Sequence, residues 1–135
     1  LYGTLAVFDL ALHSAGGHVH KADIAERQQI PEQYLAQLLS ALRRAGYIKS
    51  VRGPAGGHLL AKPAAGITVG EIVELLDGPQ VSDAPVAPEE PASKRVVQNL
   101  FADADRAAAD VLASVTFESL IEQWRNTENT LDFII

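Results

Sequence analysis

The chain has 135 residues, with 11 lysines and arginines against 17 aspartates and glutamates, so its net charge is −6. This balance excludes a uniformly basic nucleic-acid-binding protein. The chain has no cysteine, which excludes a disulfide framework and a metal held by thiolates within these residues.

The first part of the chain predicts three helices. Residues 2–12 are mostly apolar and indicate a buried helix, which a Gly-Gly pair ends. Residues 21–28 predict a short polar helix. Pro31 begins the third helix, because proline suits a first turn, where its missing N–H is not needed. Gly46 ends that helix, whose apolar positions recur at the helical period: Leu35, Leu38, Leu39 and Leu42.

A hairpin and a capped helix follow. Residues 47–51 and 58–61 flank a turn rich in glycine and proline, which predicts two antiparallel strands. Thr68 and Glu71 have the spacing of a capping box, in which each side chain satisfies a free N–H at the start of a helix. We expect this helix to stop at Gly78.

The second half begins with a different composition. Residues 79–92 are rich in proline and acids and predict a flexible loop. Ser93 is expected to cap a long helix, and Thr116 to begin a last helix with Trp124 in the core. One apolar stripe runs along the long helix and is more than one short domain could bury alone: Val97, Leu100, Phe101, Ala104, Ala108, Val111, Leu112 and Val115.

The order helix, short helix, tight turn, helix, hairpin predicts a mainly α fold. It consists of a winged helix-turn-helix domain with a small β-hairpin wing (residues 1–78), the loop (79–92), and a long helix with a C-terminal helix (93–135). In such a domain the third helix fits the major groove of DNA, and the wing reaches the minor groove or the backbone.

The charge distribution agrees with that interpretation. No acidic residue lies between Gln33 and Gly70, whereas five basic residues do. A locally basic face suffices to meet phosphate, and Arg52 at the glycine-rich turn suits a narrow minor groove. The predicted DNA-binding residues are Pro31, Gln33, Tyr34, Gln37, Arg43, Ser50, Arg52, Gly53, Gly56, Gly57 and His58.

Four motifs in combination resemble the Rrf2 family of bacterial transcription regulators: ADIAERQ, YLAQLLSALRRAG, SVRGPAGGHLLAK and ITVGEIVELLDG. The resemblance covers residues 2–78 and, more loosely, the later helices. It implies a homodimer whose long helices cross, with each subunit reading half of a near-palindromic DNA operator. The long helix within residues 93–135 is then the dimerisation helix, and its apolar stripe from Val97 to Val115 is the expected dimer interface. The wing and the Pro31 helix lead us to expect a transcriptional repressor, and the absence of cysteine is compatible with the cytoplasmic location that we expect.

Many members of this family carry three cysteines in the loop after the Thr68 helix and bind an iron–sulfur cluster there. This chain has none; Arg95 falls near the last cysteine position, and Gln98 falls where some relatives have a histidine. Iron–sulfur clusters are held mainly by thiolates, so no cofactor is expected. Relatives without a cluster exist, including one that works through a partner enzyme, which leaves a regulatory protein and a small-molecule effector as alternatives.

Other functions find less support in the residues. His18 and His20 flank a glycine turn without nearby acids at ligand spacing, so no metal site is predicted. Asp9, Asp23 and Glu26 are expected to be solvated, and no nucleophile or phosphate-loop motif indicates an enzyme. A winged-helix module that binds proteins rather than DNA is the alternative, favoured by the acidic net charge and by Ala36, where some relatives have an acidic base-reading residue. No bilayer-spanning apolar run is present. Because the chain opens on Leu1 and has no methionine, it is expected to be part of a longer sequence.

Overall fold

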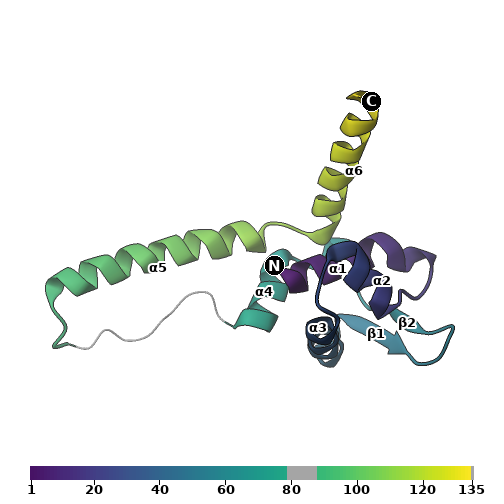
Figure 1. Ribbon diagram of the computed structural model, residues 1–135. Helices are drawn as coiled ribbons and strands as arrows, with labels where there is room; N and C mark the ends of the chain where they lie inside the picture. The colour runs from purple at the N-terminus through teal and green to yellow at the C-terminus, as the bar shows by residue number, and fades with distance from the viewer. Residues whose placement is uncertain (79–87, 135) are drawn as a thin grey trace.

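The computed structural model describes residues 1–78 and 88–134, with side chains up to residue 131. The first half of the chain forms a compact unit, from which the last two helices extend in different directions (Figure 1). The helices are α1 (Tyr2–His13), α2 (Lys21–Gln28), α3 (Glu32–Arg44), α4 (Val69–Asp77), α5 (Ala92–Ala113) and α6 (Phe117–Ile134). Short 3₁₀ turns lie at Ser14–Gly16 and Ala64–Gly66.

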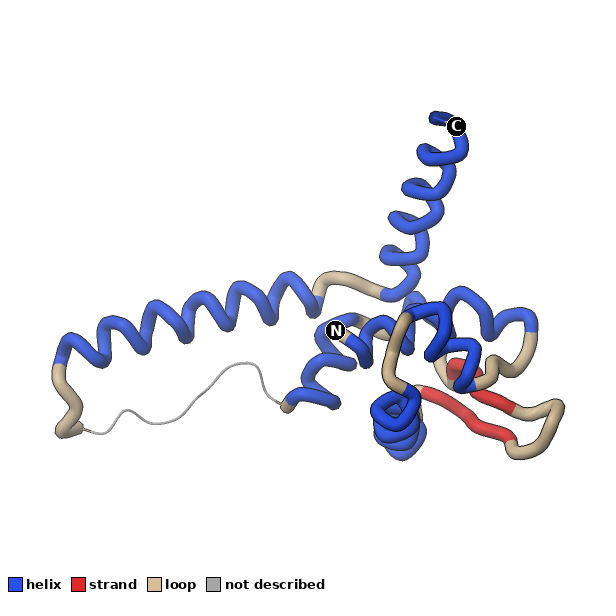
Figure 2. The backbone as a smooth tube through the Cα atoms, in the orientation of Figure 1, coloured by secondary structure: helices blue, strands red, loops and turns tan. Residues whose placement is uncertain are grey.

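Strands β1 (Ile48–Val51) and β2 (Gly57–Leu60) make the antiparallel hairpin, with Ser50 opposite His58 (Figure 2). The backbone of His58 also exchanges two hydrogen bonds of 2.8 Å with Val19, so the segment before α2 adds one bridge to the hairpin. The predicted mainly α fold with a β-hairpin wing is confirmed.

The element boundaries follow local signals. The capping box is present: the Glu71 N–H donates to the Thr68 hydroxyl at 3.2 Å, and Glu71 Oε2 accepts from the Thr68 N–H at 2.8 Å. Gly46 has the positive φ of +83° that a left-handed residue after a helix adopts. Pro31 stands at the N-cap of α3, one position before the first helical residue.

The core gathers buried apolar residues from α1, α2, α3, β1, α4 and the start of α6. The leucines predicted at Leu35, Leu38, Leu39 and Leu42 are all buried along α3. Phe117 is fully buried, and its N–H donates to the Ile67 carbonyl at 3.1 Å. After α5, which extends away from the first unit, the chain therefore packs against that unit again at Phe117.

Three sequence predictions are wrong. Asp9 is not solvated but has no exposed surface, because its carboxylate accepts from Arg27 Nε at 2.9 Å, Arg27 Nη2 at 2.8 Å and Gln28 Nε2 at 3.0 Å. Ser93 does not cap α5, because Pro91 occupies the N-cap position and places Ser93 in the first turn. Trp124 is not in the core; it meets the edge of Phe8 but keeps 42% of its surface exposed.

Of the predicted loop, residues 79–87 lie outside the described residues. Within the described residues, no helix combines the length and the apolar character that crossing a membrane requires.

Candidate nucleic-acid interface

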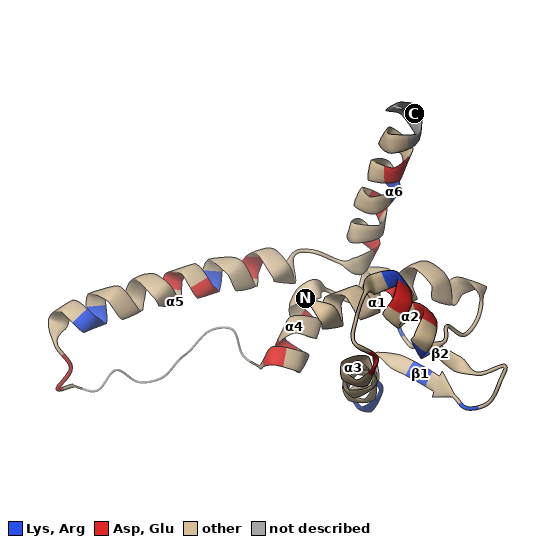
Figure 3. Ribbon diagram, viewed as in Figure 1, with Lys and Arg blue, Asp and Glu red and all other residues tan. Residues whose placement is uncertain are grey.

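Helix α3 and the hairpin lie side by side at one end of the molecule and carry most of the basic side chains of the first half (Figure 3). The acidic side chains lie mainly on α2, α4, α5 and α6 (Figure 3). Because phosphate repels carboxylates and attracts cations at short range, this segregation leaves one face of an acidic protein suited to a polyanion.

The polar residues at the start of α3 are exposed, because the leucine face of the helix is turned into the core. Gln33 and Gln37 are exposed and are one turn apart on the helix. A glutamine amide offers a donor and an acceptor, the pair that the edge of an adenine requires. This exposed edge of α3 therefore has the chemistry for reading bases.

Tyr34 at the start of α3 is in contact with a ring of α1. Its ring meets the ring of Tyr2 edge to face at a centroid distance of 5.7 Å, and 44% of its surface remains exposed. The contact fixes the ring while leaving part of it accessible to a ligand. Nearby, Lys21 Nζ lies 3.7 Å from Glu32 Oε1, so the start of α2 and the start of α3 are linked by charge.

The turn between the strands projects from the hairpin and holds Arg52, which is exposed. Gly53 and Gly57 have φ values of +105° and +135°, which favour glycine. A Cβ on Gly56 would collide with the carbonyl oxygen of Val51. The turn therefore closes tightly only with glycine, which presents Arg52 at the mouth of the wing.

The two strands are joined by side chains as well as by backbone. Ser50 Oγ lies 2.7 Å from His58 Nδ1, and the two residues stand opposite one another in the register of the hairpin. Desolvation by burial lowers the pKa of the His58 ring, and the positive charges of Arg43 and Lys21 lower it further. The ring is therefore mostly neutral at neutral pH.

The structure thus brings the predicted DNA-binding residues to α3 and the hairpin, but whether they touch DNA remains a prediction. Two polar residues that the sequence analysis did not single out lie beside them: Lys21 and Ser40, which line a hollow with Arg43, Ser50 and His58. Sequence reasoning missed them because Lys21 lies on a different helix and Ser40 lies between buried leucines. A basic residue at the first position of α2 is the signal that was available.

The apolar stripe of α5 forms a second surface. Its residues in the middle of the helix are exposed, including Leu100 at 66% and Phe101 at 64%. At the end of the stripe, Leu112 and Val115 pack against the core of their own chain. An isolated chain rarely leaves a row of large apolar side chains in water.

The positions that could take a cluster lack suitable donors. The chain has no cysteine, and Arg95 is exposed on α5 with a cationic guanidinium that has no lone pair to offer iron. Among the described residues, no group of three His, Asp or Glu side chains is placed to hold a metal ion. The residues present do not fit an iron–sulfur cluster.

Comparison with known proteins agrees with this geometry. The sequence profile of the Rrf2 family, described as an iron-dependent transcriptional regulator, matches residues 1–123. An HTH-type transcriptional regulator of Neisseria meningitidis serogroup A is 36% identical, covering 96% of this chain and 88% of that protein. The HTH-type transcriptional regulator IscR of Escherichia coli is 51% identical over 56% of this chain and 47% of its own length.

Solved structures show the same architecture. CymR, the global cysteine regulator of B. subtilis, superimposes with a TM-score of 0.75 at 36% identity, covering 90% of this chain and 92% of its own. IscR of T. potens superimposes with a TM-score of 0.71 at 36% identity, covering 90% and 82%.

Proposed function

The chain belongs to the Rrf2 family of transcriptional regulators, and from this premise we propose that it is a homodimeric, cytoplasmic repressor that works without an iron–sulfur cluster. Its relatives are named HTH-type transcriptional regulators, and this name supports DNA binding as the activity. The observation that carries the proposal is the pairing of an exposed polar edge on α3 with a projecting basic wing, both within the stretch from Gln33 to Gly70 that holds no acidic residue.

The two parts of that face have different roles in the proposal. Gln33, Tyr34 and Gln37 reach base edges or phosphates in the major groove. Arg52 enters the adjacent minor groove, where the tight glycine turn allows the backbone to approach the sugar–phosphate chain. In the same proposal, the DNA backbone is contacted by Pro31, Arg43, Ser50 and His58.

The exposed stripe of α5 supports the homodimer. Val97, Leu100, Phe101 and Val111 are between 52% and 66% exposed, and a second copy crossing at the stripe would cover them. A twofold dimer presents two copies of the α3 edge and of the wing, so a near-palindromic operator is the DNA that it matches.

In this proposal the two halves of the chain have different functions. Residues 1–78 bind DNA, and residues 93–135 dimerise through α5. Helix α6 packs back onto α1 through the Phe8–Trp124 contact. Because no thiolate is available, the signal reaches the protein as a small molecule or a regulatory partner rather than through a resident cluster.

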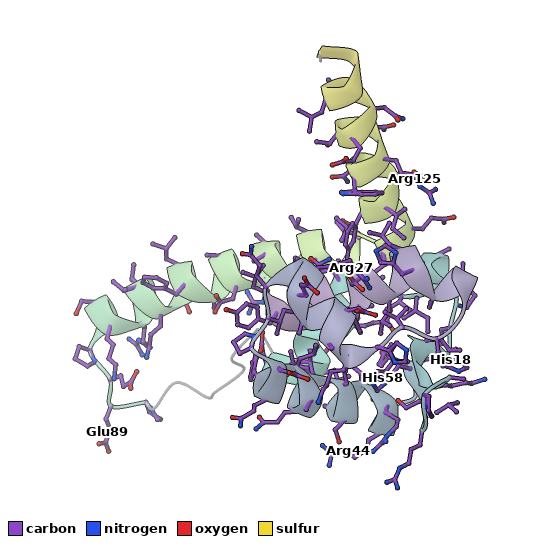
Figure 4. All side chains as sticks on the ribbon, turned by 45° about the vertical axis from the view of Figure 1, so that its right-hand side comes forward. His18, Arg27, Arg44, His58, Glu89 and Arg125 are labelled. Carbon is purple, nitrogen blue, oxygen red and sulfur yellow. The ribbon has the colours of Figure 1, made fainter. Side chains whose placement is uncertain are left out.

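The proposal is tested by selecting bound sequences from a random DNA library and then measuring affinity by fluorescence anisotropy. We expect salt-sensitive, specific binding. Arg52→Ala should weaken specific binding by about 1–3 kcal/mol. Arg125→Ala, which removes the same side chain from α6 (Figure 4), is the control and should leave affinity unchanged.

Absence of specific binding, with and without candidate effectors, would overturn the proposal. Capture of a stable protein partner in that case would favour the alternative of a protein-binding module. Transcription from a reporter carrying the selected operator should fall when the protein is expressed, and a rise would contradict the assignment as a repressor.

The dimer has its own test by light scattering. Phe101→Glu places a charge in the stripe and should convert the dimer to a monomer. Asn99→Glu places the same charge on the opposite side of α5 and is expected to leave the dimer intact. A wild-type monomer at micromolar concentration would refute the role of the stripe.

A further inference from the structure

A cavity of about 310 Å³ opens between α2, α3 and the hairpin. Its lining has an apolar part, Ala36 and Leu39, and a polar part: Lys21, Ser40, Arg43, Ser50 and His58. A single water needs only about 10–15 Å³ of such space, so the cavity has room for a hydrated small ion or for one group of a larger ligand.

The polar side chains that line the cavity favour a negatively charged ligand. Lys21 and Arg43 are cations, Ser40 and Ser50 carry hydroxyl donors, and the residues that line the cavity include no acid. Lys21 Nζ lies 3.7 Å from the Glu32 carboxylate, whose side chain is 60% exposed. A doubly charged anion inside the cavity can therefore share Lys21 with a solvated carboxylate.

His58 reports the electrostatic potential in this region. Burial lowers the pKa of its ring first, and positive charge adds to the effect from three directions: Arg43 on α3, Lys21 on α2, and His18 and His20 on the segment before α2. Ser50 engages Nδ1 at 2.7 Å, so contact with a ligand falls to Nε2. Figure 4 places His58 inside the first unit close to α3, and Arg44 on the outer side of that helix.

We propose that this cavity is an oxyanion site that takes one phosphate group, held by Arg43, Lys21 and the two serine hydroxyls. The group is either a backbone phosphate of bound DNA, which rests on the proposed function, or a free phosphate anion. Charge-assisted hydrogen bonds from guanidinium and ammonium groups are the contacts that phosphate prefers. Located between α3 and the wing, the site would set how deeply the two enter adjacent grooves.

Occupation of the site has a consequence for His58. A dianion neutralises the cations that lower the pKa of the ring, so the pKa rises when the anion binds. By linkage, the anion is then bound more tightly as the pH falls through the titration range of His58.

The test follows the ring of His58 by NMR across a pH titration of the intact protein. Sodium phosphate should raise the pKa of His58 by about one unit relative to sodium chloride at equal ionic strength. Arg43→Gln should abolish this difference. Arg44→Gln, an exposed neighbour outside the cavity, removes the same charge and should retain it. Because both side chains are exposed, we expect both variants to fold. Unchanged midpoints of thermal unfolding would confirm this.

A second arm replaces phosphate with a duplex of about 20 base pairs that carries the selected operator. A rise with the duplex that Arg43→Gln abolishes identifies the DNA backbone as the source, and a rise with phosphate alone identifies the free anion. The proposal is overturned if neither raises the pKa of His58, or if Arg43→Gln and Arg44→Gln behave alike. DNA binding with a His58 pKa that neither phosphate nor the duplex raises would refute the cavity alone, whereas a phosphate effect without DNA binding would refute the proposed function alone.

Discussion

The buried carboxylate of Asp9 is the point where a single substitution should have the clearest effect on stability. It accepts three hydrogen bonds from α2, two of them from Arg27, and it has no exposed surface. We consider Arg27→Met, which keeps an apolar stem over the site but removes the guanidinium. The carboxylate is then left in the interior with the amide of Gln28 as its remaining partner among these contacts.

The loss of stability in Arg27→Met depends on how far Asp9 and Arg27 are exposed to solvent. Removing one partner of a fully buried ion pair costs about 3–5 kcal/mol, and a hydrogen bond to a charged group contributes about 1.5–3 kcal/mol. The Arg27 side chain is 37% exposed, so solvent screens part of the attraction. We therefore expect Arg27→Met to lower the free energy of unfolding by about 2–3 kcal/mol at neutral pH.

The loss of stability in Arg27→Met should become smaller as the pH falls. Burial alone raises the pKa of the Asp9 carboxyl, but hydrogen bonds from Arg27 and Gln28 and the charges of Arg27 and His13 hold it below its ordinary value. The stabilisation is therefore present above the unfolded pKa of about 3.9 and is lost as the pH falls through the lower folded value. In Arg27→Met burial dominates, so Asp9 takes a proton more readily and the difference from wild type shrinks in acid.

Urea denaturation followed by circular dichroism, at one protein concentration and several pH values, measures this difference. Asp23→Asn is the control, because Asp23 is exposed one turn before Arg27, and its effect should stay within about 0.5 kcal/mol. The reasoning fails if Arg27→Met costs no more than this control, or if its cost is the same at every pH.

Three further substitutions test the packing that positions the candidate interface. Phe117→Ala removes a fully buried ring that anchors α6 and should cost about 3–5 kcal/mol in thermal unfolding; a cost like that of a surface change would contradict the anchoring. Gly70→Ala places a Cβ 2.9 Å from the backbone nitrogen of Ala113 and should cost about 1–3 kcal/mol by forcing α4 from α5, so full stability would show that the junction yields freely. Thr68→Ala removes the capping box and should cost about 0.5–2 kcal/mol, whereas Thr68→Ser should retain most of the stability.

Much of the fold was predictable because its signals are local. The helical period of Leu35, Leu38, Leu39 and Leu42, the capping box at Thr68, and the glycine turn of the wing each involve residues within a few positions of one another. Such patterns determine which backbone conformation is favoured and where it ends. The exposed polar edge of α3 and Arg52 could be predicted for the same reason, because each lies within one continuous sequence motif.

Other features depend on which elements meet in space. Asp9 belongs to an apolar helix and was expected in water, but α2 covers it with Arg27 and Gln28, 18 and 19 positions further along the chain. Trp124 has the spacing of a core residue, yet its ring meets the ring of Phe8 at the surface of α1 and stays 42% exposed. Periodicity indicates that a helix has an apolar face, but not which neighbour covers it or how far along the helix.

Patterns along the chain were therefore enough to predict the elements, the wing and the acid-free stretch from Gln33 to Gly70, because these arise from short-range preferences of the backbone and from composition. The tertiary structure alone decided the burial of Asp9, the exposure of the α5 stripe in a single chain, and the meeting of Lys21 with Ser40, Arg43 and His58 around one cavity. Those features require residues from separate elements to converge, and convergence is set by how the faces pack against one another.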